Sequence, residues 1–270
     1  MTAVPPTPGP PPRAAPPPPA APPPKPPNNL VGLGVLVGLV AAGVALDRGV
    51  APKLTTFAFV MLAWVLSVMA HEFAHAITGY VAGDWTVRPK GYLSFDPRRY
   101  GDVGTSLVLP LVFLALGGIG FPGGAVYLRN DLMRSRLWRS AAALAGPAAT
   151  LVVLLVLASV LRIWMASGTV SPLFPALAFL AFLQATALIL NLLPVPGLDG
   201  FGAIRPFLPA EWAPQLRRVE GLVMVAMFLL IFLTPVGGQL IFGTGAKLAA
   251  RLGVPVEAVQ IGFESFRFWR

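Results

Sequence analysis

The chain has 270 residues, of which 56% are hydrophobic and only 11% are charged, so we predict an integral membrane protein rather than a soluble one. Its net charge of +9 does not indicate a nucleic-acid partner, because the basic residues are spread over short loops between apolar segments. The lack of cysteine excludes disulfides and thiolate ligands. Any metal site must therefore use His, Asp, Glu or Asn.

The N-terminal stretch 1–29 contains fifteen of the thirty prolines. Such a composition cannot form a helix or bury a core, and it predicts a disordered, polyproline-II-like tail. The tail could bind a proline-reading domain, but a plain tether is the simpler interpretation.

Apolar segments predict an all-α polytopic membrane protein with about five full transmembrane helices. They cover residues 30–46, 56–80, 137–165, 173–193 and 222–242. We predict one transmembrane domain over 30–242, with its core at 57–200. The remaining 243–270 ends in aromatic and basic residues typical of an interfacial anchor.

Two further elements are predicted between the second and third spans. The alternation of Tyr92 and Ser94 with Leu93 and Phe95 predicts a short strand within 86–95, as half of a β-hairpin. The segment 104–126 is apolar but rich in glycine, and basic loops lie on both sides of it. A full crossing would place one basic loop outside, so we predict a re-entrant segment lining the active-site cavity.

The second predicted span contains the most informative motif, His71-Glu72-Phe-Ala-His75. Residues four apart lie on the same face of a helix, so both imidazoles can bind one zinc ion while Glu72 acts as a general base. Ionisable side chains are costly within a membrane helix, and these are the only two histidines in the chain. Two buried imidazoles that bond to neighbouring helices would explain neither the spacing nor the glutamate.

A catalytic zinc site needs three protein ligands, and the third must here be acidic. Asp199 follows an apolar helix in the run Asn-Leu-Leu-Pro-Val-Pro-Gly-Leu-Asp-Gly, residues 191–200. Pro194 and Pro196 end that helix, and the neighbouring glycines allow turns that direct a carboxylate inward. Asp199 could instead cap the helix that begins near Phe201. Beside the histidine motif, the role of zinc ligand is favoured.

Three motifs together carry a resemblance to a known family: His71–His75, Ala145-Gly-Pro147 and Asn191–Gly200. Over about residues 57–235 the chain resembles the site-2 protease family of intramembrane zinc metalloproteases, in particular small bacterial members without a PDZ domain. The resemblance implies that His71, His75 and Asp199 bind Zn²⁺, that Glu72 activates water, and that Asn191 holds or polarises the substrate. The family often has Asn shortly after Gly-Pro, where this chain has Thr150.

The activity so implied is hydrolysis of peptide bonds within or next to transmembrane segments of a membrane-protein substrate. Glu72 would take a proton from water and pass it to the leaving amine. The unwound substrate could pair with the edge of the predicted strand, or the hairpin could simply cover the cavity. A metal or proton transporter is the alternative from another class, and a catalytically silent family member that binds membrane proteins is the other.

The distribution of charge also predicts location. Basic loops should lie in the cytoplasm, which places the N-terminus and the opening of the active site on the cytoplasmic side of the cell membrane. Arginines in these loops are expected to contact anionic lipid head groups. The sequence does not indicate an oligomeric state.

Overall fold

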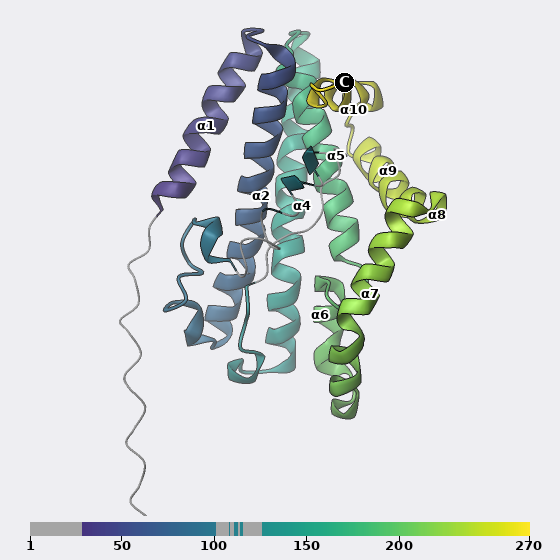
Figure 1. Ribbon diagram of the computed structural model, residues 1–270. Coiled ribbons are helices and arrows are strands. Elements are labelled where there is room, and N and C mark those ends of the chain that lie inside the picture. The colour runs from purple at the N-terminus through teal and green to yellow at the C-terminus, as the bar shows by residue number, and fades with distance from the viewer. Residues whose placement is uncertain (1–28, 101–107, 109–110, 113, 116–125) are drawn as a thin grey trace, which may run out of the picture.

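A computed structural model describes residues 29–100, 108, 111–112, 114–115 and 126–270 (Figure 1). The predicted tail 1–29, Asn29 apart, and most of the predicted re-entrant segment 104–126 lie outside this range, and both stay predictions.

Within the described range the chain is helical, as expected. The longer helices are α1 (Leu30–Asp47), α2 (Pro52–Ala82), α4 (Arg136–Ser167), α5 (Leu173–Asn191) and α7 (Ala213–Leu233). Shorter helices are α6 (Asp199–Ile204), α8 (Pro235–Gly238), α9 (Thr244–Arg251) and α10 (Val256–Phe266). The 3₁₀ turns used below are η1 (Trp85–Val87) and η2 (Pro97–Arg99), and η7 (Gln239–Gly243) is a π-helix.

The number of full spans differs from the prediction. Among the described residues, only α1, α2, α4 and α5 are each long and apolar enough to cross a membrane. The predicted fifth span, 222–242, is instead bent by 92° between Arg218–Leu233 and Pro235–Arg251. Pro235 has no N–H with which to continue α7, and Thr234 before it is extended. Counting this bent pair as one span gives at most five.

The predicted β-hairpin is wrong: residues 86–95 form η1 and a series of turns, and no strand occurs among the residues the structure describes. The Asp84 carboxylate accepts a hydrogen bond from the Thr86 N–H at 3.0 Å, which starts η1. Gly91 has a φ of +77°, and its carbonyl accepts a hydrogen bond from the Ser94 hydroxyl. These local bonds close the chain into turns, and they outweigh the weak alternation on which the strand prediction rested.

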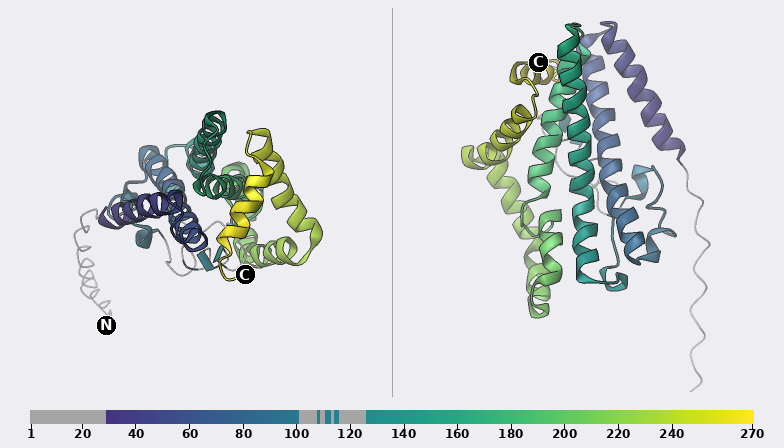
Figure 2. Two further views of the ribbon diagram at one scale, coloured as in Figure 1. Left: turned by 90° about the horizontal axis from the view of Figure 1, so that it is seen from above. Right: turned by 180° about the vertical axis from the view of Figure 1, so that it is seen from behind.

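Helix α2 is the centre of the bundle. It packs against α1 on one side and α4 on the other, and it also contacts α5 (Figure 1; Figure 2). One core cluster joins Trp64 of α2 to Phe179 and Leu183 of α5 and to Phe266 of α10. Helices α2 and α5 run in the same direction (Figure 1).

The C-terminal part contains two helices, α9 and α10, and α10 lies across one end of the bundle (Figure 2). The Phe57 and Phe266 rings are 5.2 Å apart, and a Cβ on Gly262 would come within 2.1 Å of the Pro175 carbonyl oxygen. Glycine at this position therefore lets α10 lie directly on the backbone of α5. The interfacial role predicted for 243–270 stays a prediction.

Candidate metal centre

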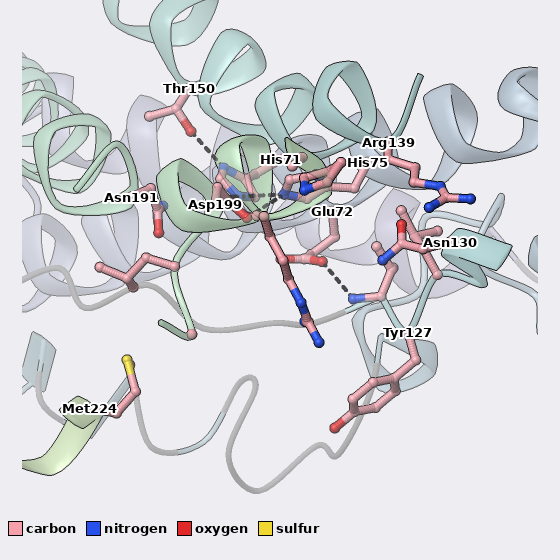
Figure 3. Close-up of a pocket in the computed structure, with 18 of the residues that line it drawn as sticks. His71, Glu72, His75, Tyr127, Asn130, Arg139, Thr150, Asn191, Asp199 and Met224 are labelled. Atoms are coloured by element: carbon pink, nitrogen blue, oxygen red, sulfur yellow. Dashed lines mark hydrogen bonds and ion pairs between the residues drawn. The ribbon is translucent and has the colours of Figure 1, made fainter. Parts of the chain in front are cut away.

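The two histidines of α2 face the same point. His71 and His75 are buried, and their Nε2 atoms are 3.0 Å apart (Figure 3). This follows from the four-residue spacing on a helix. His71 lies eleven residues before Ala82, where α2 ends, which is about 16 Å along the helix axis. The pair is therefore nearer the end of the bundle that carries the 83–100 loop.

Asp199 reaches the same point from another part of the chain. Its Oδ2 lies 3.1 Å from Nε2 of His71, and its Oδ1 lies 3.3 Å from Nε2 of His75. Asp199 is the first residue of α6, but the N-cap is Leu198 and no side chain caps this helix. Asp199 is therefore not the N-cap of this helix, and the alternative role of a helix cap does not apply. The structure brings together residues separated by 128 positions in the sequence.

Nδ1 of each imidazole, the ring nitrogen that faces away from this point, already has a partner. Nδ1 of His75 donates to the Ala142 carbonyl oxygen at 2.7 Å, since a carbonyl can only accept. Nδ1 of His71 lies 2.9 Å from the Thr150 hydroxyl, which itself donates to the Gly146 carbonyl. Both Nε2 atoms are then left with lone pairs, and these face each other and the Asp199 carboxylate. Such a set of donors can hold a cation at its centre.

The spacing of these atoms fits zinc. Tetrahedral ligands with bonds of about 2.0–2.1 Å are separated by roughly 3.3 Å. The two Nε2 atoms and the carboxylate oxygens lie 3.0–3.3 Å apart. Two imidazoles and one carboxylate also form a ligand set known for catalytic zinc, with the fourth position left open.

Gly146 of α4 faces the histidines without a side chain of its own. A Cβ placed on Gly146 would lie 2.2 Å from Nε2 of His75 and 2.4 Å from Nε2 of His71. Any larger residue would therefore occupy the space of the metal or displace the rings. Pro147 follows within the same helix, which continues without a break.

Glu72 lies beside the histidines without being aimed at the same point. His71, Glu72 and His75 each offer one potential ligand atom, and these three atoms lie within 4.8 Å of one another. Glu72 is only 2% exposed, and its Oε2 accepts a hydrogen bond from the Val126 N–H at 3.0 Å (Figure 3). This bond fixes the carboxylate next to the metal position, as a general base requires.

A cavity of about 1010 Å³ opens onto the centre. Asn191, at the C-terminal end of α5, lines it and is buried (Figure 3). Sequence reasoning did not find three further residues that line the cavity, namely Tyr127 and Asn130 before α4 and Arg139 in its first turn. No spacing rule connects these residues to the histidines. Thr150, whose role the sequence left open, lies one turn after Gly146 on the same face of α4.

Comparisons with known proteins support one family. The chain is 40% identical over 240 residues to a protein of Mycobacterium tuberculosis H37Rv named "Putative zinc metalloprotease Rip2", covering 87% of this chain and 92% of the relative. A protein of Mycolicibacterium smegmatis with the same name is 39% identical over 244 residues. "Putative zinc metalloprotease YwhC" of Bacillus subtilis is 26% identical over 204 residues, covering 73% of this chain and 90% of the relative.

No family model matches the chain, and no solved structure does. The expected cofactor agrees with the names of the relatives, and the His71, Glu72 and His75 group could hold a metal ion. With 40% identity over most of both chains, the resemblance drawn from three short motifs extends to nearly the whole sequence. This chain belongs to the site-2 protease family of zinc metalloproteases.

Proposed function

We propose that this protein is a zinc metalloendopeptidase that hydrolyses peptide bonds within or next to transmembrane segments of membrane proteins. His71, His75 and Asp199 would be the zinc ligands, and Glu72 the catalytic base. The observation that carries the proposal is the position of the Asp199 carboxylate, 3.1 and 3.3 Å from the two imidazole nitrogens. In the described part of the chain, four apolar helices are each long enough to span a membrane.

When bound, zinc polarises the scissile carbonyl and lowers the pKa of water at the open position to about 7. Glu72 would take a proton from the attacking water and deliver it to the leaving amine. The Val126 N–H holds Oε2 of Glu72, so the carboxylate keeps one orientation during both transfers. Nδ1 of His71 and of His75 are bonded away from the metal, so the Nε2 atoms stay directed inward.

Asn191 is assigned to the substrate. Its amide can donate to a peptide carbonyl and accept from a peptide N–H, and it lies on the same cavity as the metal centre (Figure 3). Because a helical substrate hides its carbonyls in its own hydrogen bonds, it must unwind before attack. Pairing with a strand at 86–95 is not part of this proposal, since that segment forms turns.

We further infer that the protein is a multi-pass protein of the cell membrane. The end of the bundle nearest the metal centre carries the basic loops (Figure 1). Its arginines and lysine include Arg88, Lys90, Arg98, Arg99, Arg129, Arg134, Arg136, Arg139 and Arg205. By the positive-inside tendency, this end and the opening of the site would face the cytoplasm and its anionic lipids.

The N-terminus would lie on the same side. The Asn29 side-chain oxygen accepts a hydrogen bond from the Phe95 N–H, which places the start of α1 against the 83–100 loop. The proline-rich stretch 1–29 therefore joins the bundle at its predicted cytoplasmic end.

The decisive experiment combines metal analysis with cleavage of a transmembrane reporter. We expect wild type and Glu72→Ala to contain one zinc per chain, and His71→Ala and Asp199→Ala to contain little. Only wild type should cleave the reporter. Cleavage by zinc-loaded Glu72→Ala would refute the assigned base, and equal zinc in all variants would refute the site. A transporter would instead move metal or protons across vesicles without any cleavage.

A further inference from the structure

Among the described residues, three buried side-chain donors in the wall of the active-site cavity lack a partner: Nε1 of Trp64, Nε2 of Gln184 and Nε of Arg139. Trp64 and Gln184 lie on the neighbouring helices α2 and α5. Each of the two is 2% exposed. An unpaired buried donor destabilises a fold, so two of them on neighbouring helices of one cavity indicate a function. We call these two residues the inner pair.

The inner pair lies two helical turns from the metal centre. Trp64 precedes His71 by seven residues, and Gln184 precedes Asn191 by seven residues. Seven residues return to the same helix face and correspond to about 10 Å along the axis. Because α2 and α5 run in the same direction (Figure 1), both steps lead away from the basic loops. Trp64 and Leu183, the neighbour of Gln184, belong to one core cluster.

The wall between the inner pair and the metal centre has small side chains. Ser67 of α2 and Ala187 of α5 line the cavity between the two levels. The Ser67 hydroxyl donates to the Ala63 carbonyl at 2.9 Å, so its own donor is satisfied within the helix. The cavity therefore extends from the proposed site of hydrolysis past these small residues to the unpaired donors of the inner pair.

The chemistry of the inner pair matches an extended peptide. The indole N–H of Trp64 can only donate, whereas the amide of Gln184 can both donate and accept. A transmembrane segment that has unwound presents carbonyl and N–H groups that have lost their helical partners. At about 3.3 Å per residue, a distance of 10 Å corresponds to roughly three extended residues.

We propose that Trp64 and Gln184 form a binding subsite for the backbone of the unwound substrate, about three residues from the scissile bond. The subsite lies on the side away from the basic loops. This inference rests on the proposed peptidase function and adds where the substrate chain is held. Binding of the substrate would give both donors the partners that they lack in the free enzyme.

The first test removes each donor with little change of shape. We expect Trp64→Phe and Gln184→Met each to lower kcat/KM for a synthetic transmembrane peptide about two- to tenfold, mainly through KM. Zinc content should stay the same. The thermal midpoint of Gln184→Met should be unchanged or higher because an unpaired donor is gone, whereas Trp64→Phe also leaves a small void in the core, which lowers its midpoint. Trp164→Phe is the matched control, since that indole donates to the Thr169 carbonyl and does not line the cavity.

The second test weakens the partner on the substrate. Esters replace single peptide bonds at positions two to four residues from the cleavage site, because an ester carbonyl accepts hydrogen bonds poorly. One such ester should slow cleavage by wild type, while Trp64→Phe or Gln184→Met should cleave the ester and the amide peptide equally. If Trp64→Phe is poorly folded, Gln184→Met alone decides the outcome.

The subsite would be overturned if both variants cleaved the peptide at the wild-type rate. It would also be overturned if the ester slowed cleavage equally in wild type and in both variants, because the donors would then not bind the substrate backbone. Glu72→Ala separates this failure from that of the proposed function. If Glu72→Ala is inactive while both inner-pair variants match wild type, only the subsite is wrong. If Glu72→Ala still cleaves, the peptidase mechanism itself fails.

Discussion

The Thr150 hydroxyl lies 2.9 Å from Nδ1 of His71 and donates its own proton to the Gly146 carbonyl. Thr150 must therefore accept the Nδ1 proton of His71, which leaves the lone pair of Nε2 directed at the metal position. A residue from α4 thus selects the tautomer of a ligand on α2. The sequence left the role of Thr150 open, and the structure supplies one.

Thr150→Val should weaken zinc binding without unfolding the protein. Valine keeps the shape but cannot accept the Nδ1 proton, and loss of such a bond typically costs 10–100-fold in metal affinity. Competition with a chelator measures this change, and Thr150→Ser should retain most of the affinity. Thr186→Val is the control, because that hydroxyl bonds to the Leu183 carbonyl and does not line the cavity. Wild-type affinity in Thr150→Val would show that the bond does not support the ligand.

Gly146→Ala should abolish zinc binding and activity. The added Cβ would lie 2.2 Å from Nε2 of His75, at the place where the metal bonds would form. Gly34→Ala in α1 is the matched control, since no atom lies within 4 Å of its Cβ. Alanine favours a helix over glycine by about 1 kcal/mol, so the control should be neutral or slightly more stable. Metal analysis of both variants checks the contrast, and normal zinc content in Gly146→Ala would contradict this geometry.

Removal of zinc should lower the thermal stability of the protein. The facing lone pairs of His71, His75 and Asp199 repel one another unless a cation or protons lie between them. A ligand present at 100 times its Kd stabilises a fold by about 2.7 kcal/mol, so the midpoint should rise with zinc concentration. Differential scanning fluorimetry with a chelator and with added zinc measures the shift. Asp199→Asn should show a much smaller one, and an equal shift would place the metal elsewhere.

Asp96→Asn should destabilise the 83–100 loop at neutral pH. The Asp96 carboxylate accepts from the Arg98 side chain at 2.8 and 2.9 Å and from its backbone N–H, which starts η2. The Arg98 guanidinium holds the pKa of Asp96 below its usual value of 3.8. The stabilisation, about 1 kcal/mol for a partly exposed pair, is present above the unfolded pKa and disappears as the pH falls through the folded pKa.

Hydrogen exchange of the 96–100 amides at pH 7 should therefore be faster in Asp96→Asn than in wild type. Stability of the two proteins should converge only below about pH 3.8, the ordinary pKa of an aspartate. A difference that persists unchanged in strong acid would mean that the charge of Asp96 is not responsible. Asp131→Asn is a useful control, because its pair with Arg129 is exposed on both sides.

Local patterns in the sequence determined the elements that depend on local physics. The apolar segments gave the helices that became α1, α2, α4 and α5, since length and hydrophobicity suffice to predict them. The four-residue spacing placed His71 and His75 together because residues four apart lie on the same face of a helix. Where the local pattern was weak, it failed: the alternation at 92–95 lost to turn chemistry, and Pro235 broke a span that hydropathy alone had joined.

Only the tertiary structure decided what comes together from different helices. The approach of Asp199 to the histidines, the bare surface of Gly146, the bond from His71 to Thr150 and the unpaired donors of the inner pair all depend on how α2, α4, α5 and α6 pack. A sequence shows residue types and their spacing along one helix. It does not show the depth and rotation at which separate helices meet, because these depend on side-chain packing along the full length of each contact.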